Sequence, residues 1–241
     1  MTYCVGTMLD SGLVFASDSR THASVDNFAS FCKMTVFERK GDRVIVLLSS
    51  GNLAGTQAVI SMLSQRNARE DSQNLWAAQS MFDTAILVSD AMREVDQRDG
   101  QNLAASNISF NASFILGGQI AGEQPRLFRI YAQSNFIEAS FDTPYLQTGE
   151  TKYGKPIIGR VLTRSTSLND AAKCVLVSFD STMCSNLSVG MPIDLLCYQR
   201  DSLEVTMRRR FEKEDPYFNE LGRQWTEGTR QVFSRLPNLD W

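Results

Sequence analysis

The chain has 241 residues, of which 43% are hydrophobic and 21% are charged, so it fits one large soluble domain with a sizeable core. The 24 basic and 27 acidic residues give a net charge of −3. Because there is no general basic excess to hold phosphate backbones, we expect no nucleic-acid partner.

The N-terminal part of the chain predicts four strands, separated by turns and by one polar loop. Continuous apolarity around Val14 and Ala16 indicates a strand that is covered on both faces. The polar segment 19–30 is predicted to be a loop, and glycine-containing turns separate the other strands. The predicted strands are residues 2–9, 13–18, 31–38 and 43–49.

Two helices and three strands are predicted in the middle of the chain. Apolar residues recur at helical spacing in residues 53–67 and 74–98, and no proline interrupts the second segment. Alternation of apolar and polar residues predicts the strands, which are residues 107–117, 126–132 and 136–139.

The last part of the chain predicts two helices, a strand pair and a terminal helix. The two helices are residues 153–163 and 168–183, the second capped around Ser167 or Asn169. The strand pair is residues 193–198 and 203–209. Asp215 and Pro216 then supply a cap and a first-turn proline for the terminal helix.

The order of these elements indicates an α+β fold. Runs of strands alternate with pairs of helices, which favours packed layers over βαβ winding. Two sheets packed face to face, with helices on both outer faces, would bury every apolar strand predicted here. Since no linker or repeat divides the chain, we predict one domain, residues 1–241, with a C-terminal helical extension at about 215–241.

The five cysteines indicate a reducing compartment. Their number is odd, no Cys-x-x-Cys pair occurs, and most lie in apolar runs, which does not suit a disulfide framework. We find no basic and apolar leader typical of a signal peptide, and no apolar run approaches the ~20 residues that span a bilayer. We therefore expect a cytoplasmic protein with no membrane partner.

His22 is the only histidine, and this limits the chemistry. A histidine-based triad would have to be built on this one residue, which lies in the polar segment and fits an exposed loop position. Multi-histidine metal sites are excluded within one chain, and the scattered cysteines do not replace them. If the chain is an enzyme, we expect hydrolysis without metal or cofactor.

Thr2 follows Met1 directly, and a small second residue permits removal of the methionine. A threonine at the N-terminus carries a hydroxyl nucleophile and a free α-amine that can act as its base. The unperturbed pKa of an α-amine is about 7.7–8.0, so a useful fraction is unprotonated near neutral pH. Asp18 and Lys33 follow on the next predicted strands and complete an N-terminal-threonine hydrolase set.

Each of these residues also has an ordinary structural explanation. A threonine at position 2 is common, and Gly51 fits a plain turn. Lys33 is more informative, because a lysine among apolar neighbours must either be paired or lie at a strand edge. Asp18 alone would fit the end of a strand, but together with Lys33 it favours an ion pair.

An ordered set of residues resembles the proteasome-type β subunits. The element order is similar to the four-layer αββα fold of the N-terminal-nucleophile (Ntn) hydrolases, and this resemblance covers the full chain. Residues 12–21 and Phe37-Glu38 narrow the resemblance to the bacterial HslV-like branch called Anbu, the proposed ancestral β subunit. The set is Thr2, Gly6, Asp18, Arg20, Lys33 and Ser50-Gly51.

The resemblance implies a role for each matching residue. Thr2 resembles the nucleophile, whose Oγ attacks a peptide carbonyl while its α-amine moves the proton. Lys33 resembles the lysine that lowers the pKa of the nucleophile's groups, and Asp18 the carboxylate that holds this lysine. Gly51 matches the glycine whose N–H stabilises the oxyanion, and Arg20 a basic position with a supporting role.

Three features depart from the family pattern, one of which is the Asp-x-x-Ser expected before the last strand pair, where this chain has Asn186 and Val189. β subunits often have a small residue after the nucleophile, where this chain has Tyr3. The Gly-Ser-Gly of the family corresponds to Gln147-Thr148-Gly149, so a hydroxyl is kept at Thr148. The nucleophile and the lysine are unchanged.

Two functions are open at this point. The first is a threonine peptidase that acts on peptides or unfolded proteins inside a large self-compartmentalised homo-oligomer, with an unidentified regulator or ATPase. The second is a non-catalytic or weakly active scaffold subunit of such a particle. The Thr2, Asp18 and Lys33 set favours the first, because a scaffold has no need of a buried lysine.

Overall fold

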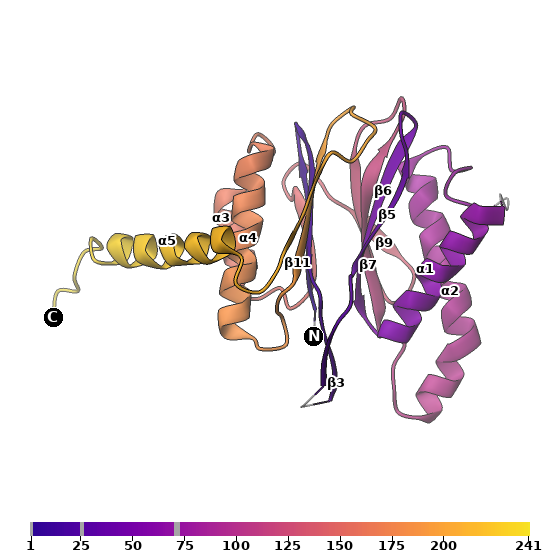
Figure 1. Cartoon of the computed structure of the whole chain (residues 1–241), viewed down its shortest axis with the longest axis horizontal. Helices are drawn as coiled ribbons and strands as arrows, with labels where there is room; N and C mark the ends of the chain where they lie inside the picture. The colour runs from indigo at the N-terminus through magenta and orange to yellow at the C-terminus, as the bar shows by residue number, and fades with distance from the viewer. Residues whose placement is uncertain (1, 25–26, 70–72) are drawn as a thin grey trace.

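Two five-stranded antiparallel sheets stack face to face in the computed structural model, and helices cover both outer faces (Figure 1). The structure describes residues 2–24, 27–69 and 73–241. This arrangement confirms the predicted α+β fold with four αββα layers. No helix in the described ranges is both long and apolar enough to cross a bilayer.

The first sheet has the strand order β10-β1-β2-β11-β12. Of its three inner strands, β1 and β2 are buried along their whole length, as the continuous apolar run predicts for β2. The strands are β1 (Tyr3–Leu9), β2 (Gly12–Asp18), β10 (Tyr145–Gly149), β11 (Ile193–Gln199) and β12 (Met207–Phe211).

The second sheet has the strand order β5-β6-β7-β8-β9. Its longest pairing joins β6 to β7 in a register that runs from Arg43 opposite Ile120 to Gly51 opposite Ala112. The strands are β5 (Met34–Arg39), β6 (Arg43–Gly51), β7 (Ala112–Ile120), β8 (Arg126–Ile130) and β9 (Phe136–Glu138).

The helices divide between the two outer faces. α1 (Leu53–Arg69) and α2 (Met81–Ala105) cover the second sheet, and α3 (Lys155–Val161) and α4 (Leu168–Ser185) cover the first (Figure 1). α5 (Pro216–Phe233) contacts α4 and then extends away from the body of the molecule (Figure 1).

Alternation along each strand divides the core into three layers. On β2, Leu13 and Phe15 face the other sheet and Val14 and Ala16 face the helices, so the strand is covered on both faces, as predicted. The β6 residues Ile45 and Leu47 pack against α1 and α2. The inter-sheet layer is therefore built from alternate residues of both sheets.

The prediction of a loop at residues 19–30 was wrong. β3 (Arg20–Ser24) and β4 (Asn27–Ser30) form an antiparallel hairpin. The hairpin is a separate two-stranded sheet rather than part of either core sheet. His22 lies on β3, but its side chain is outside the part of the chain that the structure describes, so its exposure stays a prediction. The strand predicted to begin at residue 31 begins at Met34.

Other boundaries differ where local capping or turn geometry overrides periodicity. α2 begins at Met81 rather than at residue 74, because the Ser80 hydroxyl accepts the Asp83 N–H and caps the helix. β7 begins at Ala112, five residues after Asn107 adopts a positive φ of 55°. α3 and β12 are shorter than predicted, and β10 was not predicted.

The predicted caps of α4 and α5 are confirmed. The Ser167 hydroxyl accepts the Asp170 N–H at the start of α4. Asp215 caps α5 by accepting the N–H groups of Tyr217 and Phe218, each at 3.0 Å. Each cap satisfies backbone donors that lack a partner in the first turn of a helix.

Candidate active site

Thr2 lies directly before β1, and the backbone of a neighbouring loop holds it in place. Its carbonyl oxygen accepts the Glu150 N–H at 2.7 Å. Gly149 packs so closely that a side chain there would collide with this same oxygen, and its φ of +82° also favours glycine. The loop after β10 therefore fixes the position of residue 2.

The predicted pair of Asp18 and Lys33 is present and buried. Lys33 Nζ lies 2.7 Å from Asp18 Oδ1, and the two side chains are 5% and 0% exposed. Lys33 also donates to the carbonyl oxygen of Arg20 at 2.8 Å, and Asp18 Oδ1 accepts the Tyr3 N–H at 3.0 Å. One carboxylate oxygen thus holds both the lysine and the residue after Thr2.

The pKa of the Asp18 carboxyl in this pair is set mainly by burial. Burial raises the pKa of the Asp18 carboxyl above its ordinary value, because a charged group loses hydration in the interior. The Lys33 ammonium and the Tyr3 N–H oppose this shift, because each stabilises the carboxylate form. The charge of Lys33 is therefore held at one place by a partner that the protein encloses.

Tyr3 anchors the strand that carries Thr2. Its hydroxyl accepts a hydrogen bond from Gln147 at 2.6 Å and lies 3.1 Å from the Ser178 hydroxyl. Its ring packs on Phe179 with the ring centroids 4.6 Å apart, and burial raises the pKa of its hydroxyl. The large residue that replaces the family's small one therefore ties β1 to β10 and α4.

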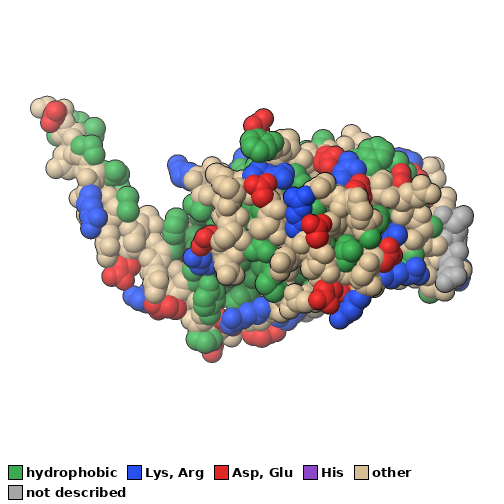
Figure 2. Space-filling model, turned by 90° about the horizontal axis from the view of Figure 1, so that it is seen from above, with side chains coloured by type: hydrophobic (Ala, Val, Ile, Leu, Met, Phe, Trp, Pro, Cys, Tyr) green, Lys and Arg blue, Asp and Glu red, His purple; other side chains and the backbone are tan. Residues whose placement is uncertain are grey.

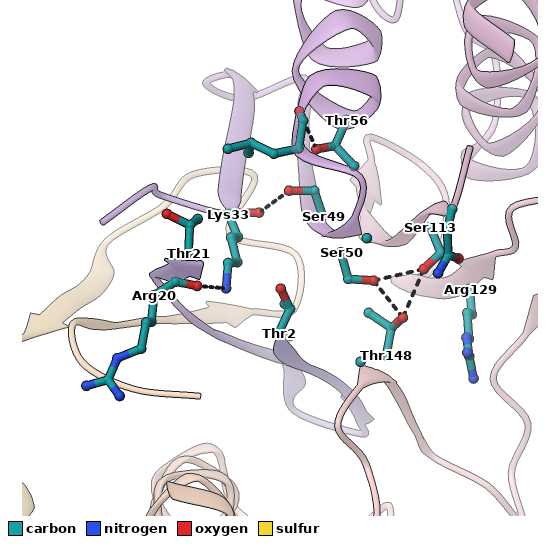
Figure 3. Close-up of a pocket in the computed structure, with 14 residues that line it drawn as sticks. Thr2, Arg20, Thr21, Lys33, Ser49, Ser50, Thr56, Ser113, Arg129 and Thr148 are labelled. Atoms are coloured by element: carbon teal, nitrogen blue, oxygen red, sulfur yellow. Dashed lines mark hydrogen bonds between the residues drawn. The ribbon is translucent and has the colours of Figure 1, made fainter. Parts of the chain in front are cut away.

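Five of the six predicted site residues line one pocket of about 500 Å³ (Figure 3). These five are Thr2, Arg20, Lys33, Gly51 and Thr148. The sixth, Asp18, is behind the pocket wall and is connected to it through Lys33. The structure therefore brings together residues that lie up to 146 positions apart in the sequence.

Gly51 occupies the end of β6, where the backbone has no room for a side chain. Its φ is +97°, and a Cβ here would collide with the carbonyl oxygen of Asn111. This close approach of two backbones explains why glycine follows Ser50. It places the backbone of Gly51 on the wall of the pocket that contains Thr2.

Arg20 connects the pocket to the loop before β11. Its guanidinium donates to the carbonyl oxygen of Leu187 at 2.7 Å and packs against Gly190. The Arg20 carbonyl oxygen, rather than its side chain, accepts from Lys33. Arg20 therefore contacts both Lys33 and this loop, and the supporting role at the site stays a prediction.

Three hydroxyls form a cluster beside Thr2, of which only Thr148 was predicted as a site residue, whereas Ser50 was named only as part of the Ser50-Gly51 match. The Ser50 Oγ lies 2.8 Å from both Ser113 Oγ and Thr148 Oγ1, and the last two are 3.0 Å apart (Figure 3). The signal for the other two was their position on β6 and β7. Each continues the face of an apolar inter-sheet residue, Leu48 before Ser50 and Ile115 after Ser113.

The pocket is thus the polar end of the inter-sheet layer. On β1 and β10, the inter-sheet residues are Cys4 and Leu146. Thr2 comes two positions before Cys4 and Thr148 two positions after Leu146, so each shares the face of its apolar neighbour.

All five cysteines are free thiols. Among the described residues, no cluster of three or more His, Cys, Asp or Glu could hold a metal ion.

Comparison with known proteins gives matches among solved structures. No protein-family model matches the chain, and no curated protein matches it. Anbu (ancestral beta-subunit) from Yersinia bercovieri is 47% identical, with 99% of each chain covered and a TM-score of 0.93. The Anbu complex of Pseudomonas aeruginosa, solved as a helical assembly, is 50% identical, with 99% of this chain and 98% of that chain covered and a TM-score of 0.94. An Anbu (Gly-1) mutant from Hyphomicrobium sp. strain MC1 is 48% identical over the whole of both chains, with a TM-score of 0.93.

Proposed function

The chain belongs to the Anbu family of proteasome-like β-subunit relatives, and from this premise we propose that it is a threonine peptidase. The nucleophile is Thr2 after removal of Met1, which lies outside the described residues. The observation that carries the proposal is the buried ion pair of Lys33 with Asp18 at the pocket that Thr2 lines. Enclosing a charge costs desolvation free energy even when the charge is paired, so an enclosed lysine at this pocket favours a catalytic role over a scaffold.

The geometry supports a separate catalytic role for each of Thr2, Lys33 and Asp18. The Thr2 hydroxyl attacks the peptide carbonyl, and the freed α-amine takes its proton and returns it to the leaving amine. Lys33 reaches into the same part of the pocket as Thr2, so its positive charge favours the ionised form of the nucleophile (Figure 3). Asp18 holds this charge in place through the 2.7 Å contact.

The backbone supplies the oxyanion site in this proposal. An N–H donor at Gly51 would stabilise the negative oxygen of the tetrahedral intermediate, as backbone donors do in other acyl-transfer enzymes. The polar cluster of Ser50, Ser113 and Thr148 supports the side of the pocket next to Thr2. The substrates are peptides or unfolded proteins, and the free cysteines support a cytoplasmic location.

We also propose that the protein works as a homo-oligomer. A relative from Pseudomonas aeruginosa was solved as a helical assembly. In this chain the extension at about 215–241 exposes large apolar side chains, which suits contacts between copies of one proteasome-like domain of residues 1–241. Confinement within such a particle would keep an unselective nucleophile away from folded proteins.

An active-site label tests the proposed chemistry. A peptide epoxyketone traps an N-terminal threonine through both its Oγ and its α-amine, so other nucleophiles do not give the same adduct. Intact mass measurement should show loss of Met1 and then one adduct per chain. Thr2→Ala should abolish the adduct, and Lys33→Ala should slow its formation.

The matched control is Lys173→Ala, because this lysine is exposed on α4 and pairs with Asp170 away from the pocket. The labelling rate of this variant should equal that of the wild type. A chain that keeps Met1 and takes no label would be the non-catalytic subunit. Labelling at any residue other than Thr2 would show that the site has been assigned incorrectly.

A further inference from the structure

The pocket that contains Thr2 is strongly one-sided in charge. Its 14 lining residues include the three cations Arg20, Lys33 and Arg129 but no Asp or Glu. The chain as a whole has a net charge of −3, so this pocket is a local positive region on an acidic protein. A low-dielectric cavity lined by one sign of charge concentrates ligands of the other sign.

Arg129 reaches this pocket because of the alternation along β8. Phe128 and Ile130 face α1 and α2, whereas Leu127 faces the other sheet. Arg129 is two residues after Leu127 and so shares its face. It stands where the inter-sheet layer turns from apolar to polar, with the hydroxyl cluster lying between it and Thr2 in Figure 3.

Arg129 differs from the other two cations in that no hydrogen bond or ion pair joins its guanidinium to another group within the described part of the chain. Lys33 is paired with Asp18, and Arg20 donates to a backbone carbonyl. The Arg129 Nε is buried and has no hydrogen-bond partner, and its guanidinium carbon lies 4.8 Å from the ring centroid of Tyr131. This ring orients the guanidinium but accepts no conventional hydrogen bond from Nε.

The contrast with Arg126 on the same strand is informative. Arg126 is held by Glu138 through two hydrogen bonds of 2.7 Å and by Glu123 at 3.1 Å. Its charge is therefore already satisfied, and it does not line the pocket. Three residues further on, Arg129 keeps its donors available in the pocket that the candidate nucleophile also lines.

We propose that Arg129 is a specificity-determining residue that binds a carboxylate of the substrate. The fork of guanidinium donors matches the two oxygens of a carboxylate, and such charge-assisted hydrogen bonds are stronger than neutral ones. The preferred substrates are peptides with an acidic side chain, or with a free C-terminal carboxylate, close to the bond that Thr2 attacks. This inference rests on the proposed function only in calling the ligand a substrate. Binding of the carboxylate by Arg129 requires no chemistry at Thr2.

The test measures binding to the Thr2→Ala protein, which cannot form an acyl intermediate at residue 2. Three fluorescent peptides of one length are compared by anisotropy: one with an internal Glu and an amidated C-terminus, one with Gln and an amidated C-terminus, and one with Gln and a free C-terminus. We expect at least one carboxylate peptide to bind about tenfold more tightly than the neutral peptide, a ratio typical of a charged hydrogen bond. Which one gains affinity identifies the source of the carboxylate.

Variants then assign the preference to Arg129. Arg129→Gln in the Thr2→Ala protein should reduce the tenfold ratio to about one, and Arg129→Lys should keep part of it. The matched control is Arg126→Gln, which removes a cation from the same strand and should leave the ratio unchanged. Thermal melts and native mass are recorded for every variant, so that a misfolded protein is recognised. If Arg129→Gln is misfolded, the binding ratio of Arg129→Lys is compared with that of the Thr2→Ala protein instead.

The outcomes separate this proposal from the proposed function. Equal binding of the three peptides, or no binding of any, overturns the role of Arg129 even if Thr2 takes the active-site label. A tenfold ratio that survives Arg129→Gln also overturns it. A native mass that falls only in Arg129→Gln would show that Arg129 binds another copy of the chain, and this would overturn the proposal too. If Thr2 takes no label but the ratio depends on Arg129, the peptidase proposal fails and the carboxylate site remains.

Discussion

Lys33 and Asp18 form an ion pair that connects the two sheets of the protein. Asp18 is the last residue of β2 in the first sheet, and Lys33 directly precedes β5 in the second. Their Nζ and Oδ1 atoms are 2.7 Å apart in a place where neither side chain is more than 5% exposed. The pair therefore fixes the relative position of the sheets next to the residue that carries the candidate nucleophile.

Removing either partner should have unequal effects on stability. Asp18→Ala leaves the buried Lys33 ammonium without its carboxylate, which typically costs about 3–5 kcal/mol of unfolding free energy. Lys33→Met removes the cation and keeps an apolar stem, so it should destabilise less while abolishing peptidase activity. Denaturant unfolding of both variants measures the difference.

The control for this comparison is Glu227→Ala, which breaks an exposed ion pair with Arg223 on α5. Exposed pairs contribute little, so its unfolding curve should nearly match that of the wild type. Small and equal shifts for all three variants would mean that the Lys33 and Asp18 pair is accessible to solvent.

The raised pKa of Asp18 predicts a dependence of stability on pH. The folded chain binds this proton more tightly than the unfolded chain, in which the pKa of aspartate is about 3.9. Binding of this proton therefore adds its full contribution to the unfolding free energy below about pH 3.9. This contribution declines as pH rises through the raised pKa of Asp18. Asp18→Asn keeps an oxygen acceptor for Lys33 and for the Tyr3 N–H but has no proton to bind.

The unfolding free energy of the wild type minus that of Asp18→Asn should thus decrease from acidic to neutral pH. Denaturant unfolding at a series of pH values gives this difference. A difference that increases toward neutral pH would show that Lys33 lowers the pKa of Asp18 more than burial raises it.

The sequence predicted the buried strands well because they are covered on both faces. Residues 13–18 read as a continuous apolar run, and in the structure β2 has α4 on one side and the second sheet on the other. The same sequence pattern could not predict the β3 and β4 hairpin. That hairpin lies outside both core sheets, and its short strands show no regular alternation of apolar and polar residues from which a strand could be predicted.

One part of the candidate site could be predicted from the order of residues near the N-terminus and from the family resemblance. Thr2, Asp18 and Lys33 occur early in the chain and follow the family pattern. Ser113 and Arg129 were missed because their role depends on which face of β7 and β8 meets the other sheet. That assignment needs the register of the sheet, which pairs Ile115 with Arg129 and is set by contacts distant in sequence.

Tyr3→Phe should destabilise the protein without removing any group that we assign to catalysis. The change leaves the buried Nε2 donor of Gln147 without its acceptor, and an unsatisfied buried donor costs about 1–3 kcal/mol. The control is Tyr145→Phe, since the Tyr145 hydroxyl has no hydrogen-bond partner in the described residues. Thermal unfolding should separate the two variants, and equal melting temperatures would contradict the anchoring role of Tyr3.

The last prediction concerns α5 and the residues that follow it. Only Phe218 and Gly222 of this helix are buried, so most of it receives no cover from its own chain. Figure 2 shows apolar side chains along the projecting arm. The exposed large apolar residues of this segment are Tyr217, Trp225, Val232, Phe233, Leu236, Leu239 and Trp241.

Because so much apolar surface is rarely left in water, we expect this segment to mediate contacts between copies of the chain. A stop codon after Gly228 keeps the buried Phe218 but removes residues 229–241, so it should lower the native mass in light scattering. The thermal stability of each isolated chain should change little, because the deleted side chains are exposed. Arg223→Ala, on the opposite face of the helix from Val232, is the control and should keep the native mass. A wild type that is monomeric at micromolar concentration would contradict the assembly, and an unchanged mass after truncation would exclude this segment from it.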